Sequence, residues 1–267
     1  MLSAQRAEHR KQLRAAIFDV DGVLVASPHE RAWQEALAEL MAGEWREIAA
    51  ATSYAPDRFD TALYQAHVAG KPRMSGARAV LDYFGVPEAE RRAIEYGERK
   101  QRLIRDLIAA GEFVAFVDAL RFLVDLRAHH VRTAAASSSK NANDFMRQIR
   151  VAQFVPEAEG RAGGAEQTLL ELFDANVCGR DVLRGKPHPE IFLMAAEELR
   201  VPSAECVVVE DAPAGIEAAK AGGMMALGVA RLNDEELLEA AGADLVVKAL
   251  DEVKVEALLA GRLQRVH

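Results

Sequence analysis

Short apolar runs alternate with helix-like repeats along most of the chain. Six runs predict buried strands, at residues 15–20, 131–136, 174–178, 206–209, 226–230 and 244–247. An apolar run of this length, bounded by turn signals, is typical of a strand covered on both faces. Between the later runs, apolar spacings of three and four predict helices at 120–130, 190–199 and 214–221. Strands separated by helices imply right-handed crossovers, so the sequence predicts an α/β fold with a doubly wound, mostly parallel sheet.

The stretch after the first strand has a different pattern. Residues 30–112 read as helix throughout, with expected helices from Trp33 to Gly43, across 59–66, from an N-cap at Ser75 to Gly85, and over 88–111. We therefore expect an α/β core domain of residues 1–29 and 113–267 and an inserted all-helical domain of residues 30–112. Ligands of such sheets bind beyond the carboxyl ends of the strands. An insertion that leaves from that edge is expected to act as a cap.

Polar side chains gather where the predicted strands end. The first strand ends in Asp19 and Asp21, the second in Ser137, the third leads to Lys186, and the fourth ends in Glu210 and Asp211. Each alone is weak evidence, because an isolated Asp-x-Asp is usually a solvated loop and a serine run usually caps a helix. The carboxyl ends of parallel strands meet at one edge, so together these residues predict a site.

The chemistry that suits this set is phosphoryl transfer. Asp19 and Asp211, with help from Glu210, offer the hard oxygen ligands that Mg²⁺ prefers, and Asp21 adds its backbone carbonyl. Asp19 can also attack phosphorus and form an aspartyl phosphate. Ser137 and Lys186 can hold the oxygens of the transferring group. Asp21 is placed to exchange a proton with the leaving or attacking oxygen.

The same residues fall into four motifs: Asp19-Val-Asp-Gly-Val-Leu, Ser137 after an apolar strand, Lys186-Pro, and Val209-Glu-Asp-x-x-Ala-Gly215. In this order they resemble the motifs of the haloacid dehalogenase (HAD) superfamily, across the whole core domain. An aspartate at position 21 is similar to the phosphatase and phosphomutase branch. The helical insertion resembles the C1-type cap of that branch.

Within the branch, the sequence looks most like the β-phosphoglucomutases and related sugar-phosphate phosphatases. The resemblance implies substrate-binding roles for six residues: His29, Arg73, Lys100, Ser139, Lys140 and Asn141. Arg73, in Gly70-Lys-Pro-Arg, and the 139–141 segment would bind the distal phosphate. His29 would position Asp21, and Lys100 would reach toward the core site. Each also has a plainer explanation, since an arginine, lysine or histidine on a charged helix face is usually solvated.

The implied activity is the Mg²⁺-dependent conversion of β-glucose 1-phosphate into glucose 6-phosphate, with hydrolysis of a sugar phosphate as the alternative. Both reactions phosphorylate Asp19, and they differ in whether a sugar hydroxyl or water accepts the group. Two other classes fit less well. The helical insertion and the length speak against a receiver-type signalling domain, and the complete residue set speaks against a non-catalytic binding module.

Composition narrows the partners. The net charge of -8 and the pI of about 5.5 argue against nucleic acid or an acidic membrane, but not against a small phosphorylated sugar. Cys178 and Cys206 lie in apolar runs, as expected for buried thiols of a reducing cytoplasm. No apolar run is long enough to span a membrane. We expect a cytoplasmic protein that is a monomer or a weak homo-oligomer.

Four features depart from the mutase pattern. Ala26 stands where many relatives carry aspartate, and the segment 21–33 is about two residues shorter. Val117-Asp118 replaces a common Pro-Gly pair, which we expect to affect only the start of a helix. The loop at 156–167 is longer, and we expect it to contact the cap or a second subunit.

Overall fold

The structure, a computed structural model, describes residues 12–69, 71–156 and 166–266. The chain forms two compact units, one of residues 1–26 and 115–267 and one of residues 27–114. We call them the α/β unit and the helical unit. The predicted boundaries lie a few residues from these. The proposed tail before residue 12 and the body of the 156–167 loop lie outside the described residues.

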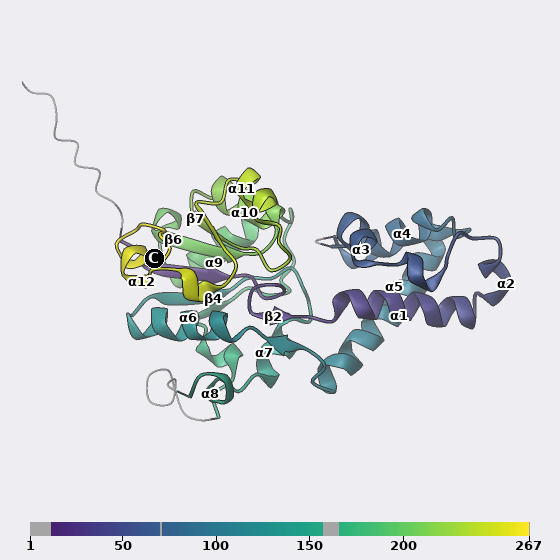
Figure 1. Ribbon diagram of the computed structural model, residues 1–267, viewed down its shortest axis with the longest axis horizontal. Helices are drawn as coiled ribbons and strands as arrows, with labels where there is room; N and C mark the ends of the chain where they lie inside the picture. Colours follow the sequence, from purple (N-terminus) through teal and green to yellow (C-terminus); the bar gives the residue numbers. More distant parts are fainter. Residues whose placement is uncertain (1–11, 70, 157–165, 267) are drawn as a thin grey trace, which may run out of the picture. The chain divides into compact units, whose positions relative to one another are not determined.

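The α/β unit is built on a six-stranded sheet (Figure 1). Its strands are β1 (Ala15–Phe18), β4 (Arg132–Ala135), β5 (Ala175–Asn176), β6 (Cys206–Glu210), β7 (Met225–Val229) and β8 (Leu245–Val247). They lie in the order β5-β4-β1-β6-β7-β8, and every pair is parallel. The chain thus builds outward from β1 on one side and then crosses to the other side. This confirms the predicted doubly wound α/β fold.

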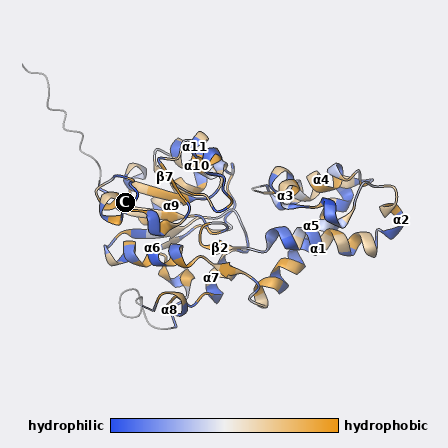
Figure 2. Ribbon diagram, viewed as in Figure 1, coloured by the Kyte–Doolittle hydropathy of each residue, from blue (hydrophilic) through white to orange (hydrophobic). Residues whose placement is uncertain are grey.

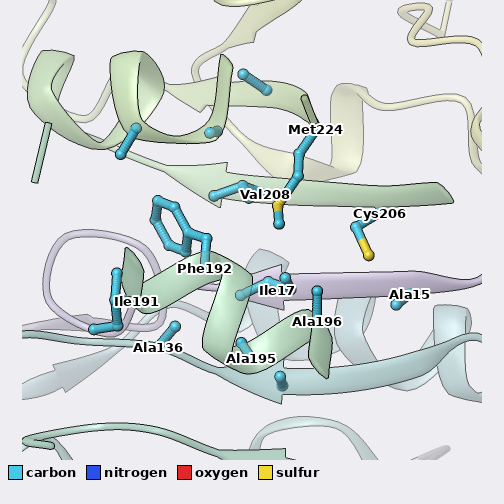
Figure 3. Close-up of a cluster of buried hydrophobic side chains, with 14 of the residues drawn as sticks. Ala15, Ile17, Ala136, Ile191, Phe192, Ala195, Ala196, Cys206, Val208 and Met224 are labelled. Carbon is cyan, nitrogen blue, oxygen red and sulfur yellow. The ribbon is translucent and has the colours of Figure 1, made fainter. Parts of the chain in front are cut away.

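Helices cover both faces of the sheet, because alternate strand residues point to opposite sides. Ile17 and Val208 point toward α9 (Glu190–Leu199) and α10 (Pro213–Ala221), where Phe192 and Met224 complete a buried cluster (Figure 3). On the other face, the ring of Phe18 lies 6.2 Å from that of Phe122 in α6 (Val117–Ala128). The strands carry hydrophobic colour, whereas the helices show both colours (Figure 2).

The remaining elements of the α/β unit are short. They are the helices α7 (Ala142–Gln148), α8 (Val151–Phe154), α11 (Glu235–Ala240) and α12 (Val255–Leu259), and the 3-10 turns Leu169–Leu172, Ser203–Glu205 and Leu250–Glu252. The sequence reading missed these helices. In α7, Ala142, Phe145 and Met146 are buried at a helical spacing, but one turn of such spacing is too short to stand out.

The helical unit has its own core. It contains α1 (His29–Ala42), α2 (Arg46–Ala49), the 3-10 turn Pro56–Arg58, α3 (Thr61–His67), α4 (Arg73–Tyr83) and α5 (Ala89–Ala109). Large apolar and aromatic side chains from these elements, among them Trp33, Leu81, Phe84 and Tyr96, pack into one buried cluster. The short strands β2 (Val25–Ala26) and β3 (Val114–Ala115) pair with each other where the chain leaves and re-enters the α/β unit.

Two helix starts differ from prediction. Helix α4 begins at Arg73 with Pro72 before it, so Ser75 lies inside the helix and is not its N-cap. Pro72 is the N-cap residue, with φ -55°. The ring of proline fixes φ near this value and leaves no N–H unpaired at the helix start. Helix α6 begins at Val117, three residues before the predicted start.

Candidate active site

The carboxyl end of β1 places Asp19 between two neighbouring strands. Phe18 is level with Ala135 of β4 and Val209 of β6. The Asp19 amide donates to the Val209 carbonyl (3.0 Å), so the ladder continues one residue beyond β1. Asp19 is only 6% exposed. It therefore lies at the strand ends beside β6, where the direction of sheet building reverses, as ligand sites of such sheets do.

Lys186 is brought to Asp19 from 167 residues away in the sequence. Its Nζ lies 2.5 Å from Asp19 Oδ1 and also donates to Glu210 Oε1. The face of the Phe192 ring lies 4.9 Å from the same nitrogen. Burial by itself lowers the pKa of Lys186, but the charges of Asp19 and Glu210 outweigh it and raise the pKa. Lys186 therefore stays charged next to the candidate nucleophile.

Both carboxylate oxygens of Glu210 accept hydrogen bonds from neighbouring groups. It is 1% exposed, and besides Lys186 it accepts bonds at Oε2 from the amides of Asp211 and Ala212 (2.8 Å each). A side chain on Gly215 would reach within 1.9 Å of Glu210 Oε1, so only glycine fits there. This carboxylate has donors at both oxygens, which favours a role in orienting Lys186 and the 210–212 backbone. The sequence reading assigned it to the metal.

Asp211 packs against the turn that follows β1. Gly22 has φ +81°, and a Cβ there would lie 1.8 Å from Asp211 Oδ2. Glycine satisfies both demands, since it tolerates positive φ and leaves space for the carboxylate. The contact brings Asp211 to the backbone next to Asp21. It also explains the glycine of the Asp-x-Asp-Gly motif.

The site carries an excess of negative charge. Burial, followed by the charges of Glu210 and Asp21, raises the pKa of Asp19 to about 7 against the opposing effect of Lys186. Burial, Glu210 and Asp19 likewise raise the pKa of Asp211. One lysine thus offsets only part of the charge of four carboxylates.

A divalent cation fits this donor set. Carboxylate oxygens and a backbone carbonyl are the ligands that Mg²⁺ takes, and its charge would favour the ionised form of both aspartates. In the part of the chain that the structure describes, no three His, Cys, Asp or Glu side chains are arranged to hold a metal ion. The set proposed below is of another kind, with two carboxylates and one backbone carbonyl.

Ser137 and the residues after it line the end of β4. Ser137 is 3% exposed, and its Oγ accepts from the Ser139 amide (3.1 Å), while Ser139 Oγ accepts from the Asn141 amide (3.3 Å). These two turns fix the backbone from β4 to α7. Lys140 is exposed and lies 3.2 Å from Asp181. All of these residues belong to the α/β unit, as do Asp19 and Lys186.

The two cysteines are buried and unpaired, as predicted. Cys178 lies near the site, which the sequence reading did not foresee. Burial raises its pKa to about 12, and the charges of Asp19 and Asp21 act in the same direction. A thiol at this pKa stays protonated and has little nucleophilic character.

The other three candidates belong to the helical unit. His29 is the first residue of α1, Lys100 lies in α5, and the Lys100 Nζ is 3.2 Å from His29 Nδ1. Lys100 is 5% exposed, and its Nζ lies 5.3 Å from the centre of the Trp33 ring. The sequence placed Lys100 on a charged helix face, but the structure buries it. The explanation of Lys100 as a solvated charge on a helix face is therefore wrong.

Arg73 begins α4 and is exposed, with its Nη1 bonded to Gln101 Oε1 at 3.0 Å. Among the residues that the structure describes, no carboxylate forms an ion pair with Arg73, whereas Arg78 and Arg99 of the same unit are paired. Gly70 of the same predicted motif lies outside the described residues.

The fold and the strand-end residues form a candidate phosphoryl-transfer site on a doubly wound sheet. The haloacid dehalogenase-like hydrolase family matches residues 13–223, and the chain belongs to that family. It is an enzyme of the phosphomutase or phosphatase kind. No helix of the described residues has the length and apolar character needed to cross a membrane.

Individual relatives narrow the comparison. The chain is 30% identical to the β-phosphoglucomutase of Bacillus subtilis (strain 168), over 92% of this chain and 94% of that one. It is also 30% identical to a phosphorylated carbohydrates phosphatase of Thermotoga maritima, over 88% and 94% of the two chains. Among solved structures, the archaeal β-phosphoglucomutase of Pyrococcus sp. strain ST 04 superposes with a TM-score of 0.68 at 31% identity, covering 93% and 98%.

Proposed function

We propose that this enzyme is a Mg²⁺-dependent phosphomutase that converts β-glucose 1-phosphate into glucose 6-phosphate through a phosphorylated Asp19. The observation that carries the proposal is the buried Asp19–Lys186 pair at the carboxyl end of β1 (2.5 Å). A carboxylate held there can attack phosphorus, and a charged lysine beside it can bind the phosphoryl oxygens. The β-phosphoglucomutase relatives in two comparisons support the choice of substrate.

The reaction takes two steps at Asp19. An Asp19 oxygen attacks the C1 phosphorus of the glucose 1,6-bisphosphate intermediate, the bond from phosphorus to the sugar oxygen breaks, and Asp21 gives that oxygen a proton, which releases glucose 6-phosphate. The 6-hydroxyl of β-glucose 1-phosphate then attacks the phosphoryl group on Asp19, Asp21 accepts its proton, the bisphosphate forms, and the Asp19 carboxylate is restored. Lys186 and Ser137 hold the phosphoryl oxygens in both steps.

Mg²⁺ would be held by the side chains of Asp19 and Asp211 and the backbone carbonyl of Asp21. When bound, it neutralises charge on the phosphoryl oxygens. Glu210 stays with Lys186 and the neighbouring amides, as its three hydrogen bonds indicate, and keeps the lysine aimed at Asp19.

A mutase must also recognise the second phosphate of a bisphosphate intermediate. We assign this task to Arg73 of the helical unit and to Ser139, Lys140 and Asn141 of the α/β unit. An arginine with no carboxylate partner in the described residues has its guanidinium available for a phosphate, which it can bind through two parallel hydrogen bonds. His29 and Lys100 would support the Asp21 turn and the substrate from the helical unit.

Hydrolysis is the second candidate, because the Thermotoga maritima phosphatase is as similar in identity as the mutase of Bacillus subtilis. In a phosphatase, water takes the place of the sugar hydroxyl, with Asp21 as the base. The α/β unit would carry both reactions with the same residues. The difference would lie in how well the helical unit excludes water and binds the sugar.

One assay separates the two. The purified enzyme is given β-glucose 1-phosphate, Mg²⁺ and a trace of glucose 1,6-bisphosphate, and both products are followed. We expect glucose 6-phosphate to form without a matching release of phosphate. Free phosphate as the main product would replace the mutase assignment by the phosphatase. No turnover of any sugar phosphate, with Mg²⁺ present, would contradict both.

A further inference from the structure

A forked ion pair lies at the carboxyl edge of the sheet, outside the residues assigned above. Arg231 follows β7, and Asp118 lies in the first turn of α6. Arg231 Nη1 is 2.9 Å from Asp118 Oδ2, and Arg231 Nη2 is 3.2 Å from Oδ1. The two side chains are 14% and 13% exposed. Asp118 Oδ2 also accepts from the Leu250 amide (2.8 Å), which ties the pair to the segment after β8.

The same guanidinium touches both segments that join the α/β unit to the rest of the chain. It stacks over the ring of Phe116, 4.0 Å from its centre, and its Nη2 is 3.5 Å from the Val23 carbonyl. The Phe116 amide donates to the Leu24 carbonyl at 2.9 Å, which links the two segments directly. Arg231 therefore contacts both the segment through which the chain leaves the α/β unit and the segment through which it returns.

The outgoing segment is the turn that carries Asp21. The amides of Leu24 and Val25 donate to the Val20 carbonyl at 2.9 and 3.0 Å, and the Gly22 amide donates to the Val25 carbonyl at 2.8 Å. These bonds close residues 20–25 into one tight turn. A shift of its outer side at residues 23 and 24 is therefore passed to Asp21, only two peptide units away.

We propose that Arg231, oriented by Asp118, is a positioning residue that holds the 20–25 turn and thereby aims Asp21 at the reacting oxygen. The proposal rests on the proposed function, in which Asp21 moves the proton. Asp118 stands where the sequence resemblance leads one to expect part of a Pro-Gly pair. A Pro-Gly pair would offer no carboxylate to Arg231. It also corrects the expectation that Val117-Asp118 affects only a helix start.

The test compares two leaving groups. A sugar oxygen needs a proton as it leaves, whereas nitrophenolate leaves without one. The sugar substrate is glucose 1,6-bisphosphate, which gives a phosphoryl group to Asp19 as p-nitrophenyl phosphate does, so kcat/KM for both substrates reports the steps up to the phosphorylation of Asp19. We expect Arg231→Met to lower kcat/KM for the sugar phosphate by about 10- to 100-fold, and that for p-nitrophenyl phosphate by less than about threefold. Arg231→Lys should recover part of the loss. Asp118→Asn should lower kcat/KM for the sugar phosphate in the same way but by less. It replaces Arg231→Met in the test if that variant does not fold.

Arg127→Met is the matched control. Arg127, near the end of α6, also forms a partly buried ion pair, with Asp174 at 3.1 Å. This pair lies at the amino end of the sheet, away from the candidate site. Its loss should lower the melting temperature without changing the ratio of the two substrates. Equal losses on both substrates in the Arg231 and Asp118 variants would overturn the inference.

Asp21→Asn is measured alongside. If it shows the leaving-group dependence and the Arg231 and Asp118 variants do not, only the positioning role is wrong. If Asp21→Asn lacks the dependence too, the acid–base assignment of the proposed function fails, and the positioning role fails with it.

Discussion

The two units present their candidate residues in different ways. In the α/β unit, the sheet register places Asp19 beside Glu210 although 191 residues separate them, and Lys186 bonds directly to both. In the helical unit, Arg73 stands at a helix start and Lys100 is buried beside His29, and no sheet register relates them. The carboxyl ends of parallel strands lie at one edge of the sheet, so polar residues at several of these ends are expected to lie close together. Helical residues lack such a constraint.

The largest effect should come from the α/β unit. Asp19→Asn removes the nucleophile, so we expect turnover to fall by more than about a thousandfold on any phosphorylated substrate. The melting temperature checks that the variant folds, and acid-stable labelling by a radioactive phosphate donor should disappear with activity. Activity above a tenth of the wild type would contradict the role of Asp19.

Gly22→Ala tests how closely the same unit is packed around the proposed metal site. The added methyl would meet Asp211 Oδ2 at 1.8 Å on a backbone with φ +81°, so the carboxylate must move. We expect the Mg²⁺ concentration for half-maximal activity to rise by about 10- to 100-fold. Gly85→Ala is a control with positive φ (+67°) and nothing within 4 Å of the new Cβ. An unchanged Mg²⁺ requirement in Gly22→Ala would contradict the assignment of Asp211.

These contacts show which parts of the fold and of the candidate site could be predicted from the sequence. The strand ends and the order of the motifs predicted the fold and the residues that gather at one edge. The partners of Glu210 were not predictable, because its bonds to Lys186 and to two amides depend on how the chain turns after β6. The Arg231–Asp118 pair joins residues 113 apart that belong to no motif. Lys100 lies in register with the buried stripe of α5, between Tyr96 and Ile104, so helical spacing could have predicted its burial. Its position over the Trp33 ring depends on the packing of α1 against α5 and could not be predicted.

Arg73→Ala asks whether the helical unit contributes to substrate choice. If Arg73 binds the distal phosphate, kcat/KM for β-glucose 1-phosphate with its bisphosphate activator should fall by about 10- to 100-fold, the loss of one charge-assisted contact. An aryl phosphate has no second phosphate, so its hydrolysis should change by less than about twofold. Arg78→Ala on the same helix, where Arg78 is paired with Asp82 and Glu90, is the matched control. Equal losses on both substrates would count against the role.

The smallest effect concerns pH and returns to Asp19. Its pKa is about 7 in the folded protein, because burial raises it from an ordinary value of 3.8. Between those two values the folded state binds more protons than the unfolded state, so this group makes the metal-free protein less stable as pH rises from about 4 to about 7. In EDTA, the melting temperature should therefore fall by on the order of 10 °C over that range, the contribution of about one proton, and by less in Asp19→Asn. Adding Mg²⁺ should raise the melting temperature more at pH 7.5 than at pH 5, because the ion favours the charged carboxylate. A wild type and an Asp19→Asn variant with the same pH slope would show that Asp19 is not held at a raised pKa.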